Sequence, residues 1–156
     1  MGIDVTVTIG GAAGQGIQTV GDLLAGVCHR AGLYLMAVND FESRIRGGHS
    51  FLELRISDQP VAAPDDQVHL LVALNPETYA IHAAEMAENG RVLIESDQAG
   101  GEALPEGEQG VNVAFTQLAK EAGGKIMANT VAAGAVLGML GAPAGLMDEV
   151  LAIRFG

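Results

Sequence analysis

The sequence predicts an α/β domain with a Rossmann-like three-layer architecture, in which helices cover a mostly parallel sheet that carries an antiparallel hairpin at its edge. Three observations support this fold class. Apolar segments with the period of a strand alternate along the chain with segments of helical period. One continuous apolar run, residues 68–74, is typical of a strand buried on both faces. A glycine-rich turn, residues 10–16, joins the first expected strand to the first expected helix.

The N-terminal part of the chain contains two expected strands around one helix. Apolar residues alternate over residues 3–9, which predicts the first strand. They then follow helical spacing over residues 17–28, and an Ala-Gly pair ends the helix. Residues 33–38 form a second apolar strand. The polar segment 39–50 has no regular period and is expected to be a loop.

The middle of the chain continues the alternation. Residues 51–56 are expected to form a strand, and the turn-forming sequence after it suggests an edge hairpin with the chain near Val61. After the buried run, an Asn-Pro-Glu sequence predicts the start of a helix over residues 75–88. Residues 91–95 then form the next strand.

The C-terminal part begins with an acidic, glycine-rich segment, residues 96–110, which is expected to be an exposed excursion. A strand over 111–115 and a short helix over 116–122 follow. Asn129 and Thr130 are expected to cap a long Ala- and Gly-rich helix that ends at residue 140, and a final amphipathic helix covers 146–151. The whole chain, residues 1–156, is long enough for one domain with its own core.

The composition restricts the class of partner. The net charge is −11, which argues against nucleic acid and anionic membranes, because both attract cationic surfaces. No signal peptide and no membrane-spanning run of apolar residues are visible, so we expect a cytoplasmic protein. Only 4% of the residues are aromatic, and the helices are rich in Gly and Ala. Since such helices supply little bulk for a deep core, we expect an apolar or arginine-bearing surface that contacts other subunits.

Cys28 is the only cysteine of the chain. A single thiol forms no internal disulfide and cannot hold an iron–sulfur cluster, which normally needs four cysteine ligands. Its apolar setting on the first helix predicts an inert core position. No cluster of His, Cys and Asp has the spacing of metal ligands, so no metal site is predicted.

The glycine-rich turn is the first candidate binding site. Its glycines permit positive φ and remove side chains, so that backbone N–H groups can face an anion at the helix N-terminus. From Gly11 onward it resembles the dinucleotide pattern G-x-G-x-x-G, with Ala13 at the second glycine position. That substitution and the late position of Asp40 weaken an interpretation as an NAD site. The alternative is a tight strand–helix turn that binds nothing.

The second candidate is a short basic segment that ends in His49. Arg44 and Arg46 lie two residues apart, and in an extended chain both point the same way. Arginine pairs suit phosphates and carboxylates, which they bind through two hydrogen bonds each. The alternative is that they pair with acids of the protein itself, such as Asp40 and Glu42, or of a partner. His49 is expected to have a structural or interface role.

Together the two segments resemble the gamma domain of 2-oxoacid:ferredoxin oxidoreductases, which is related to domain III of pyruvate:ferredoxin oxidoreductase. The resemblance rests on the following segments and covers essentially the whole chain: GAAGQGIQT (11–19), NDFESRIRGGH (39–49), LRISD (54–58), DQVHLLVALN (66–75) and NTVA (129–132). The amino-acid sequences of the first two segments resemble those of the fused, 2-oxoglutarate-type branch of the family. The chain is then a short gamma subunit or a trimmed domain of a fused chain.

The resemblance implies oxidative decarboxylation of a 2-oxoacid to an acyl-coenzyme A, with electrons passed to ferredoxin. Thiamine diphosphate, magnesium and the iron–sulfur clusters belong to partner subunits, and this chain holds no cofactor and no catalytic residue. It is implied to bind coenzyme A and to assemble with thiamine-binding alpha and beta subunits and a ferredoxin-like subunit. The following residues are candidates for contacts with coenzyme A phosphates: Gly11, Gly14, Gln15, Gly16, Arg44 and Arg46. The two arginines are alternatively contacts with a partner.

The sequence leaves three alternative functions open. These are the small subunit of an indolepyruvate-type oxidoreductase, a free-standing nucleotide-binding module, and an assembly subunit without a ligand. In isolation it is expected to be able to form a homodimer. The identity of the 2-oxoacid is not encoded here, because that selectivity should lie beside the thiamine.

Overall fold

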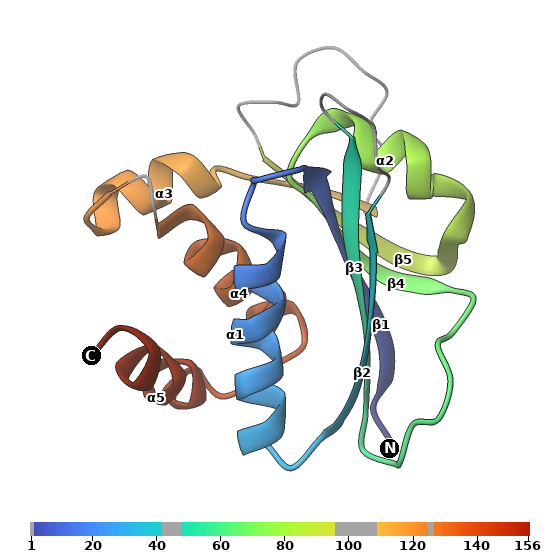
Figure 1. Ribbon diagram of the computed structural model, residues 1–156, viewed down its shortest axis with the longest axis horizontal. Coiled ribbons are helices and arrows are strands. Elements are labelled where there is room, and N and C mark those ends of the chain that lie inside the picture. The colour runs from blue at the N-terminus through green and yellow to red at the C-terminus, as the bar shows by residue number, and fades with distance from the viewer. Residues whose placement is uncertain (1, 42–47, 96–108, 125–126) are drawn as a thin grey trace.

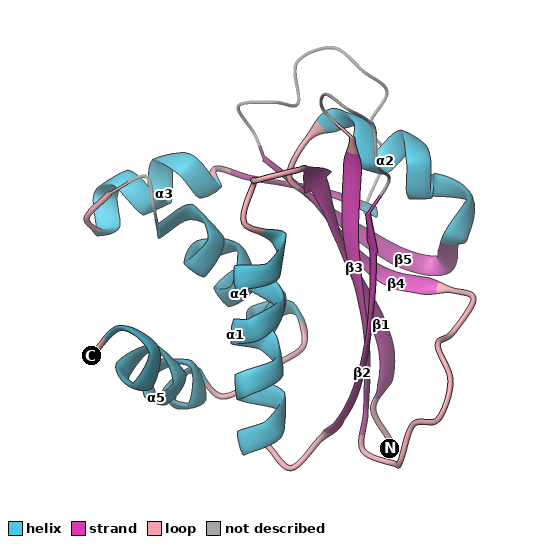
Figure 2. Ribbon diagram, in the orientation of Figure 1, coloured by secondary structure: helices cyan, strands magenta, loops and turns pink. Residues whose placement is uncertain are grey.

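The computed structural model describes residues 2–41, 48–95, 109–124 and 127–156, and it shows one six-stranded sheet between two layers of helices (Figures 1 and 2). The strand order is β2-β3-β1-β4-β5-β6. The strands are β1 (Asp4–Ala12), β2 (Tyr34–Phe41), β3 (His49–Ser57), β4 (Val68–Ala73), β5 (Met86–Glu95) and β6 (Gly110–Val113). The helices are α1 (Ile17–Arg30), α2 (Pro76–His82), the 3-10 turn η1 (Ala83–Glu85), α3 (Phe115–Ala122), α4 (Ala128–Met139) and α5 (Ala144–Phe155).

The sheet is mostly parallel, as the alternation of strands and helices predicts. β1 pairs in parallel with β4, β4 with β5, and β5 with β6. Among the described strands, only β3 runs the other way, because it is antiparallel to both β1 and β2. The predicted fold class, including an antiparallel hairpin at the edge, is confirmed.

The partner strand in that hairpin differs from the expectation. We expected residues 51–56 to pair with the chain near Val61, but β3 pairs with β2, and none of the described strands includes Val61. The hairpin therefore precedes β3 instead of following it. Asn39 and Asp40, expected in a loop, lie in β2 opposite Leu52 and Phe51. Polar side chains fit there because β2 is the edge strand and both residues are exposed.

The two faces of the sheet are covered unequally. The larger core lies between the sheet and α1, α3, α4 and α5; it contains Val7 and Ile9 of β1 and Leu52 and Leu54 of β3. Among the described helices, α2 alone packs on the other face, where a smaller cluster joins β4 and β5. Figure 2 shows this arrangement, with α1, α3, α4 and α5 on one side of the strands and α2 on the other. Because α2 is the only described helix on the second face, that face is less covered near β2 than near β4 and β5.

Several helix boundaries differ from the prediction, and α5 (Ala144–Phe155) is longer at both ends than the expected 146–151. Asn75 caps α2 as expected, since its Oδ1 accepts a hydrogen bond from the Thr78 backbone N–H at 3.1 Å, but the helix stops at His82 instead of about residue 88. β5 already begins at Met86, which pairs with Val68 of β4. Met127, not Asn129, is the N-cap residue of α4. Within the described residues, no helix is both long enough and apolar enough to cross a membrane.

Candidate functional site

The glycine turn lies at the carboxyl end of β1, where β1 meets β4. Gly11 and Ala12 still belong to the strand, opposite Ser50 and His49 of β3. The chain then turns through Gly14 at φ 87° and Gly16 at φ 82°, and α1 begins at Ile17. Both angles are left-handed, so any other residue at these two positions would be strained by roughly 1–2 kcal/mol. The local sequence thus explains why the strand can pass directly into the helix.

The surroundings of the two left-handed glycines differ. A Cβ at Gly14 would meet no heavy atom of the described residues within 4 Å. A Cβ at Gly16 would collide with the side-chain amide of Asn129 in the first turn of α4. Gly14 therefore faces space that no described residue fills, whereas Gly16 is required for the packing of α4 against the turn.

Gln15 holds the turn against the neighbouring strand. Its side-chain Oε1 accepts a hydrogen bond from the Ala12 backbone N–H at 2.6 Å, and its Nε2 donates to the Leu74 carbonyl at 3.1 Å. A Cβ at Gly11 would lie 2.5 Å from Gln15 Oε1, so Gly11 makes room for this side chain. The structure gives Gln15 and Gly11 roles inside the turn, and their contact with a ligand stays a prediction.

Two helix N-termini meet at the turn without side-chain caps from the described residues. Neither α1 nor α4 has such a capping hydrogen bond or an acidic residue in its first turn. The first N–H groups of a helix have no partner within the helix, and the helix dipole places partial positive charge there. Asn129 joins the two ends, because its amide lies against Gly16. Such an arrangement favours an anion, and a phosphate group is the anion that backbone N–H groups at helix ends commonly bind.

The comparisons with known proteins identify the family. The family model "Pyruvate ferredoxin/flavodoxin oxidoreductase" matches residues 6–156, nearly the whole chain. This chain belongs to that oxidoreductase family. The family resemblance stated from the glycine turn and the arginine segment is therefore confirmed.

Solved structures of the pyruvate ferredoxin/flavodoxin oxidoreductase family have the same fold. A 2-oxoglutarate:ferredoxin oxidoreductase from Magnetococcus marinus, with 2-oxoglutarate, coenzyme A and succinyl-CoA bound, superposes with a TM-score of 0.85 and 27% sequence identity, over 98% of this chain and 27% of that chain. The gamma subunit of a keto/oxoacid ferredoxin oxidoreductase from Geobacter sulfurreducens superposes with a TM-score of 0.80 and 30% identity, over 99% of this chain and 86% of that chain. The domain thus occurs both within a longer chain and as most of a gamma subunit.

Curated relatives show the same difference in length. The subunit alpha of a 2-oxoacid:ferredoxin oxidoreductase from a Sulfolobus species is 36% identical over 74 residues, which are 47% of this chain but only 12% of that subunit. The chain therefore spans a small part of the length of such alpha subunits. The activity of the complete enzyme belongs to a larger assembly than this family domain.

The remaining candidates of this family member are the two arginines and the histidine that follows them in the sequence. Arg44 and Arg46 lie outside the described residues. His49, directly after that segment, is buried, and its Nε2 is 2.8 Å from Nε2 of His82. His82 Nδ1 is in turn 2.8 Å from Glu85 Oε2. Because a carboxylate only accepts, Nδ1 of His82 donates to Glu85, and the Nε2 atoms of the two histidines share a hydrogen bond.

The histidine network has a structural consequence. The ring of Phe51 packs edge-on against His82, with ring centroids 4.7 Å apart. A Cβ at Gly10 would lie 3.0 Å from His49 Cε1, so the network also touches the end of β1. These contacts fix the start of β3 beside the glycine turn, which agrees with the structural role expected for His49.

Two residues that connect distant elements were not found from the sequence. Asn129 was expected to be a helix cap, and its position beside Gly16 depends on how α4 packs on α1. Glu95 ends β5 in a buried position, and its Oε2 accepts hydrogen bonds from the backbone N–H and the hydroxyl of Thr116 at the start of α3. Neither position has a local signal, because both depend on elements that are distant in the sequence.

The described residues contain no group of three or more His, Cys, Asp or Glu side chains that could hold a metal ion. Cys28 is buried in α1, as predicted, and burial raises the pKa of its thiol to about 11. The thiol is therefore protonated at neutral pH.

Proposed function

We propose that this chain is the gamma domain or gamma subunit of a 2-oxoacid:ferredoxin oxidoreductase and that its glycine turn binds phosphates of coenzyme A. The family membership and the fold support the first part. The coenzyme A and succinyl-CoA bound in the Magnetococcus marinus relative support the choice of ligand. In the assembled enzyme, a 2-oxoacid loses CO2, its acyl group passes to coenzyme A, and two electrons pass to ferredoxin.

The observation that carries the ligand assignment is the space in front of Gly14. No described side chain fills it, the uncapped N-terminus of α1 follows two residues later, and the uncapped N-terminus of α4 lies against Gly16. A phosphate there would accept hydrogen bonds from backbone N–H groups and lie at the positive ends of two helix dipoles. The chain itself then binds and orients the coenzyme, while thiamine diphosphate, magnesium and iron–sulfur clusters on partner subunits supply the chemistry of decarboxylation and electron transfer.

Several parts of this function come from the sequence alone and stay predictions. Arg44 and Arg46 are proposed to neutralise an anionic part of coenzyme A or to contact a partner. The thiamine-binding and ferredoxin-like subunits are the proposed partners, and the cytoplasm is the proposed location. The 2-oxoglutarate-type branch is our preferred assignment, because the Magnetococcus marinus relative acts on that substrate.

The test compares Gly14→Ala with Gly32→Ala in the enzyme assembled with its partner subunits. Both glycines have positive φ, 87° and 74°, and at neither would an added Cβ have a described heavy atom within 4 Å, but they lie at opposite ends of α1. The two changes therefore impose the same kind of backbone strain. Only Gly14→Ala places a methyl group where the phosphate would lie.

We expect Gly14→Ala to raise the apparent KM for coenzyme A by more than tenfold, since about two charge-assisted hydrogen bonds of about 1.5–3 kcal/mol each would be weakened. The formation of the thiamine adduct from the 2-oxoacid should be unchanged. Gly32→Ala should leave the KM for coenzyme A unchanged. If the two variants have the same KM for coenzyme A, the turn is only structural and the ligand assignment is wrong.

A further inference from the structure

The outer edge of β2 is unprotected within the part of the chain that the structure describes. β2 is the last strand of the sheet and pairs only with β3, so one side of its backbone has no partner among the described strands. Tyr34 and Val38 are 49% and 37% exposed. Natural edge strands are usually protected by lysine, proline or a bulge, and β2 has none of these, since its register with β3 is continuous. Asp40 is its only charged residue.

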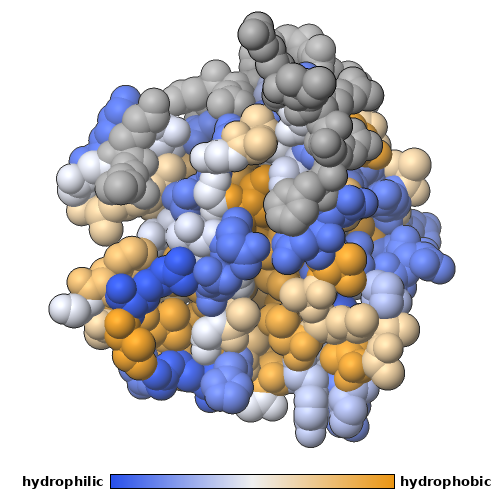
Figure 3. All heavy atoms as spheres, in the orientation of Figure 1, coloured by the Kyte–Doolittle hydropathy of each residue, from blue (hydrophilic) through white to orange (hydrophobic). Residues whose placement is uncertain are grey.

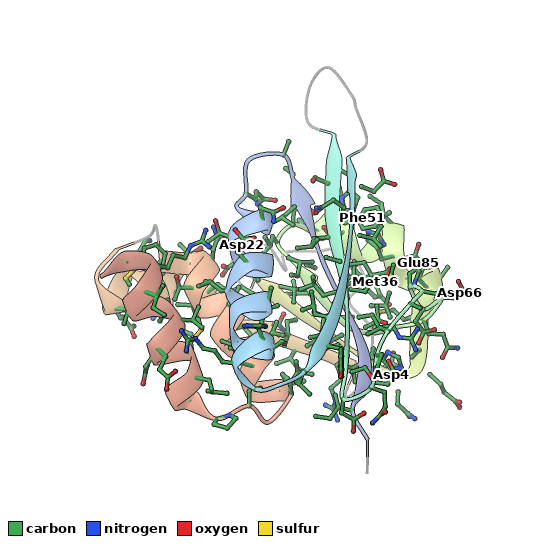
Figure 4. All side chains as sticks on the ribbon, turned by 60° about the horizontal axis from the view of Figure 1, so that its bottom comes forward. Asp4, Asp22, Met36, Phe51, Asp66 and Glu85 are labelled. Carbon is green, nitrogen blue, oxygen red and sulfur yellow. The ribbon has the colours of Figure 1, made fainter. Side chains whose placement is uncertain are left out.

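On the sheet face beside this edge, α2 reaches β3 through its last residue, His82, which contacts His49 and Phe51. α1 is the only described helix with more than marginal contact to β2 or β3, and it lies on the face of the larger core. α2 covers β1, β4 and β5 on the other face. Side chains alternate along a strand, so Glu53, which lies between the buried Leu52 and Leu54, points to this other face. Figure 4 shows Met36 and Phe51 on this side, away from α1.

Several carboxylates of the described residues act on Glu53 at this face. Partial burial raises the pKa of the Glu53 carboxyl, and the carboxylates of Glu85, Asp65 and Asp66 raise it further, although His82 has a smaller opposing effect. Figure 4 places Glu85 and Asp66 on the same side as Met36 and Phe51. The nearby Arg55 does not offset this charge, because its guanidinium is paired with Asp4 at 2.7 Å. The view in Figure 3 shows hydrophobic and hydrophilic residues side by side on the surface turned to the reader.

We infer that the β2 edge surface, made of Tyr34, Met36, Val38, Phe51 and Glu53, binds an extended, positively charged segment of a partner protein, which adds to the sheet as a further strand. This inference rests on the assembly role in the proposed function and names the surface and the chemistry of the partner. The backbone of the added strand pairs with the open edge of β2. Its lysine or arginine side chains complement the carboxylates that the described residues place around Glu53.

The spacing of strands explains how the open edge of β2 and the carboxylate of Glu53 can bind the same segment. Neighbouring strands lie about 4.8 Å apart, so the added strand is about 10 Å from β3. Val38 of β2 lies directly between the added strand and Glu53, because it pairs with Glu53 in the register of β2 and β3. A lysine or arginine on the added strand packs its aliphatic stem over Val38 and places its charged end near Glu53.

A second copy of this chain fits the surface poorly. It would bring the same carboxylates to the interface, and the chain as a whole has a net charge of −11. Like charges placed opposite one another cost affinity. The charge of the surface therefore favours a cationic partner over a homodimer.

The test uses the full chain and a synthetic peptide of about ten alternating lysine and valine residues, a length typical of a strand. A matched peptide with proline in place of valine has the same charge but cannot form a strand. We expect the valine peptide to bind and to slow hydrogen exchange in residues 34–41, and the proline peptide to leave that exchange unchanged.

Three variants locate the binding. Val38→Lys should weaken binding of the valine peptide by more than about tenfold, because it puts a positive charge on the edge. Glu53→Gln should weaken it by about two- to fivefold. Asp148→Asn removes the same charge from an exposed residue of α5 and should change it by less than about twofold. Circular dichroism shows that each variant is folded.

Two results would overturn the inference. One is binding that responds to Val38→Lys and Glu53→Gln no more than to Asp148→Asn. The other is self-association of the chain that protects residues 34–41 without any peptide, which would make the partner a second copy. The titration uses neither coenzyme A nor the thiamine-bearing subunits, so its failure is distinct from a failure of the proposed function.

Discussion

Cys28 is the buried ionisable group whose environment has the clearest consequence. Only 2% of the residue is exposed, and burial raises the pKa of its thiol from 9.0 to about 11. The folded protein therefore holds this proton more tightly than the unfolded chain does. The associated stability is complete below about pH 9 and is lost as the pH rises through about 11.

We expect the alkaline limb of the stability profile to change in Cys28→Ala. Between pH 9 and 11 the free energy of unfolding of the natural protein should fall relative to the variant, by on the order of 2 kcal/mol at the upper end. Urea unfolding at several pH values measures both proteins, and the other titrating groups cancel in the difference. Parallel pH profiles for the two proteins would show that the thiol is not desolvated as the structure indicates.

Individual site residues divide into those with local signals and those without. Gly14 and Gly16 stand out in the sequence because a strand–helix turn with two left-handed residues requires glycine. Gln15 was expected near a phosphate, yet its side chain is hydrogen-bonded within the turn and to Leu74. Asn129 reaches the turn only through tertiary packing, so no local pattern could place it there.

At the scale of elements, Gln15 connects the glycine turn to the end of β4. Gln15→Ala would leave the Ala12 N–H and the Leu74 carbonyl without these partners. We expect a loss of about 1–3 kcal/mol in the free energy of unfolding, measured by urea denaturation. Gln18→Ala is the control, because Gln18 makes an exposed hydrogen bond to Asp22 one turn further along α1. Equal stabilities for the two variants would contradict the role assigned to Gln15.

The elements themselves were predictable where their signals are local, and their ends were not. The apolar run of β4 and the Asn-Pro start of α2 are properties of short segments, and both were found. β1 continues to Ala12 because its last residues pair with β3. β2 continues to Phe41 because it also pairs with β3. Pairing between distant segments leaves no mark on the period of either one, so these extensions and the true partner of β3 were missed.

At the scale of the whole molecule, we propose that the chain acts in binding and assembly and that the redox chemistry takes place on partner subunits. Its one cysteine is buried, and burial keeps the thiol protonated at neutral pH. We expect the purified chain to reduce no artificial electron acceptor with any 2-oxoacid, and the same chain to support the reaction when it is assembled with its partner subunits. Bound flavin or iron, or acceptor reduction by the isolated chain, would refute this division of labour.

The unequal cover of the sheet belongs to the same scale. α1, α3, α4 and α5 bury one face of the sheet. On the other face α2 is the only described helix, and it touches β3 through His82 without covering β2. The expectation of a surface for subunit contact came from the Gly- and Ala-rich helices, but the surface proposed here lies on the sheet. The composition predicts a surface for subunit contact without placing it, and our inference about its position rests on the strand order.

The central claim is that the glycine turn holds the phosphates of coenzyme A. The most direct measurement is an experimental structure of the assembled enzyme with coenzyme A bound. Our account predicts a phosphate oxygen within about 2.7–3.2 Å of backbone nitrogens between Gly14 and Gln18, at the start of α1. A structure in which every phosphate of a fully occupied coenzyme A lies away from this turn would contradict it.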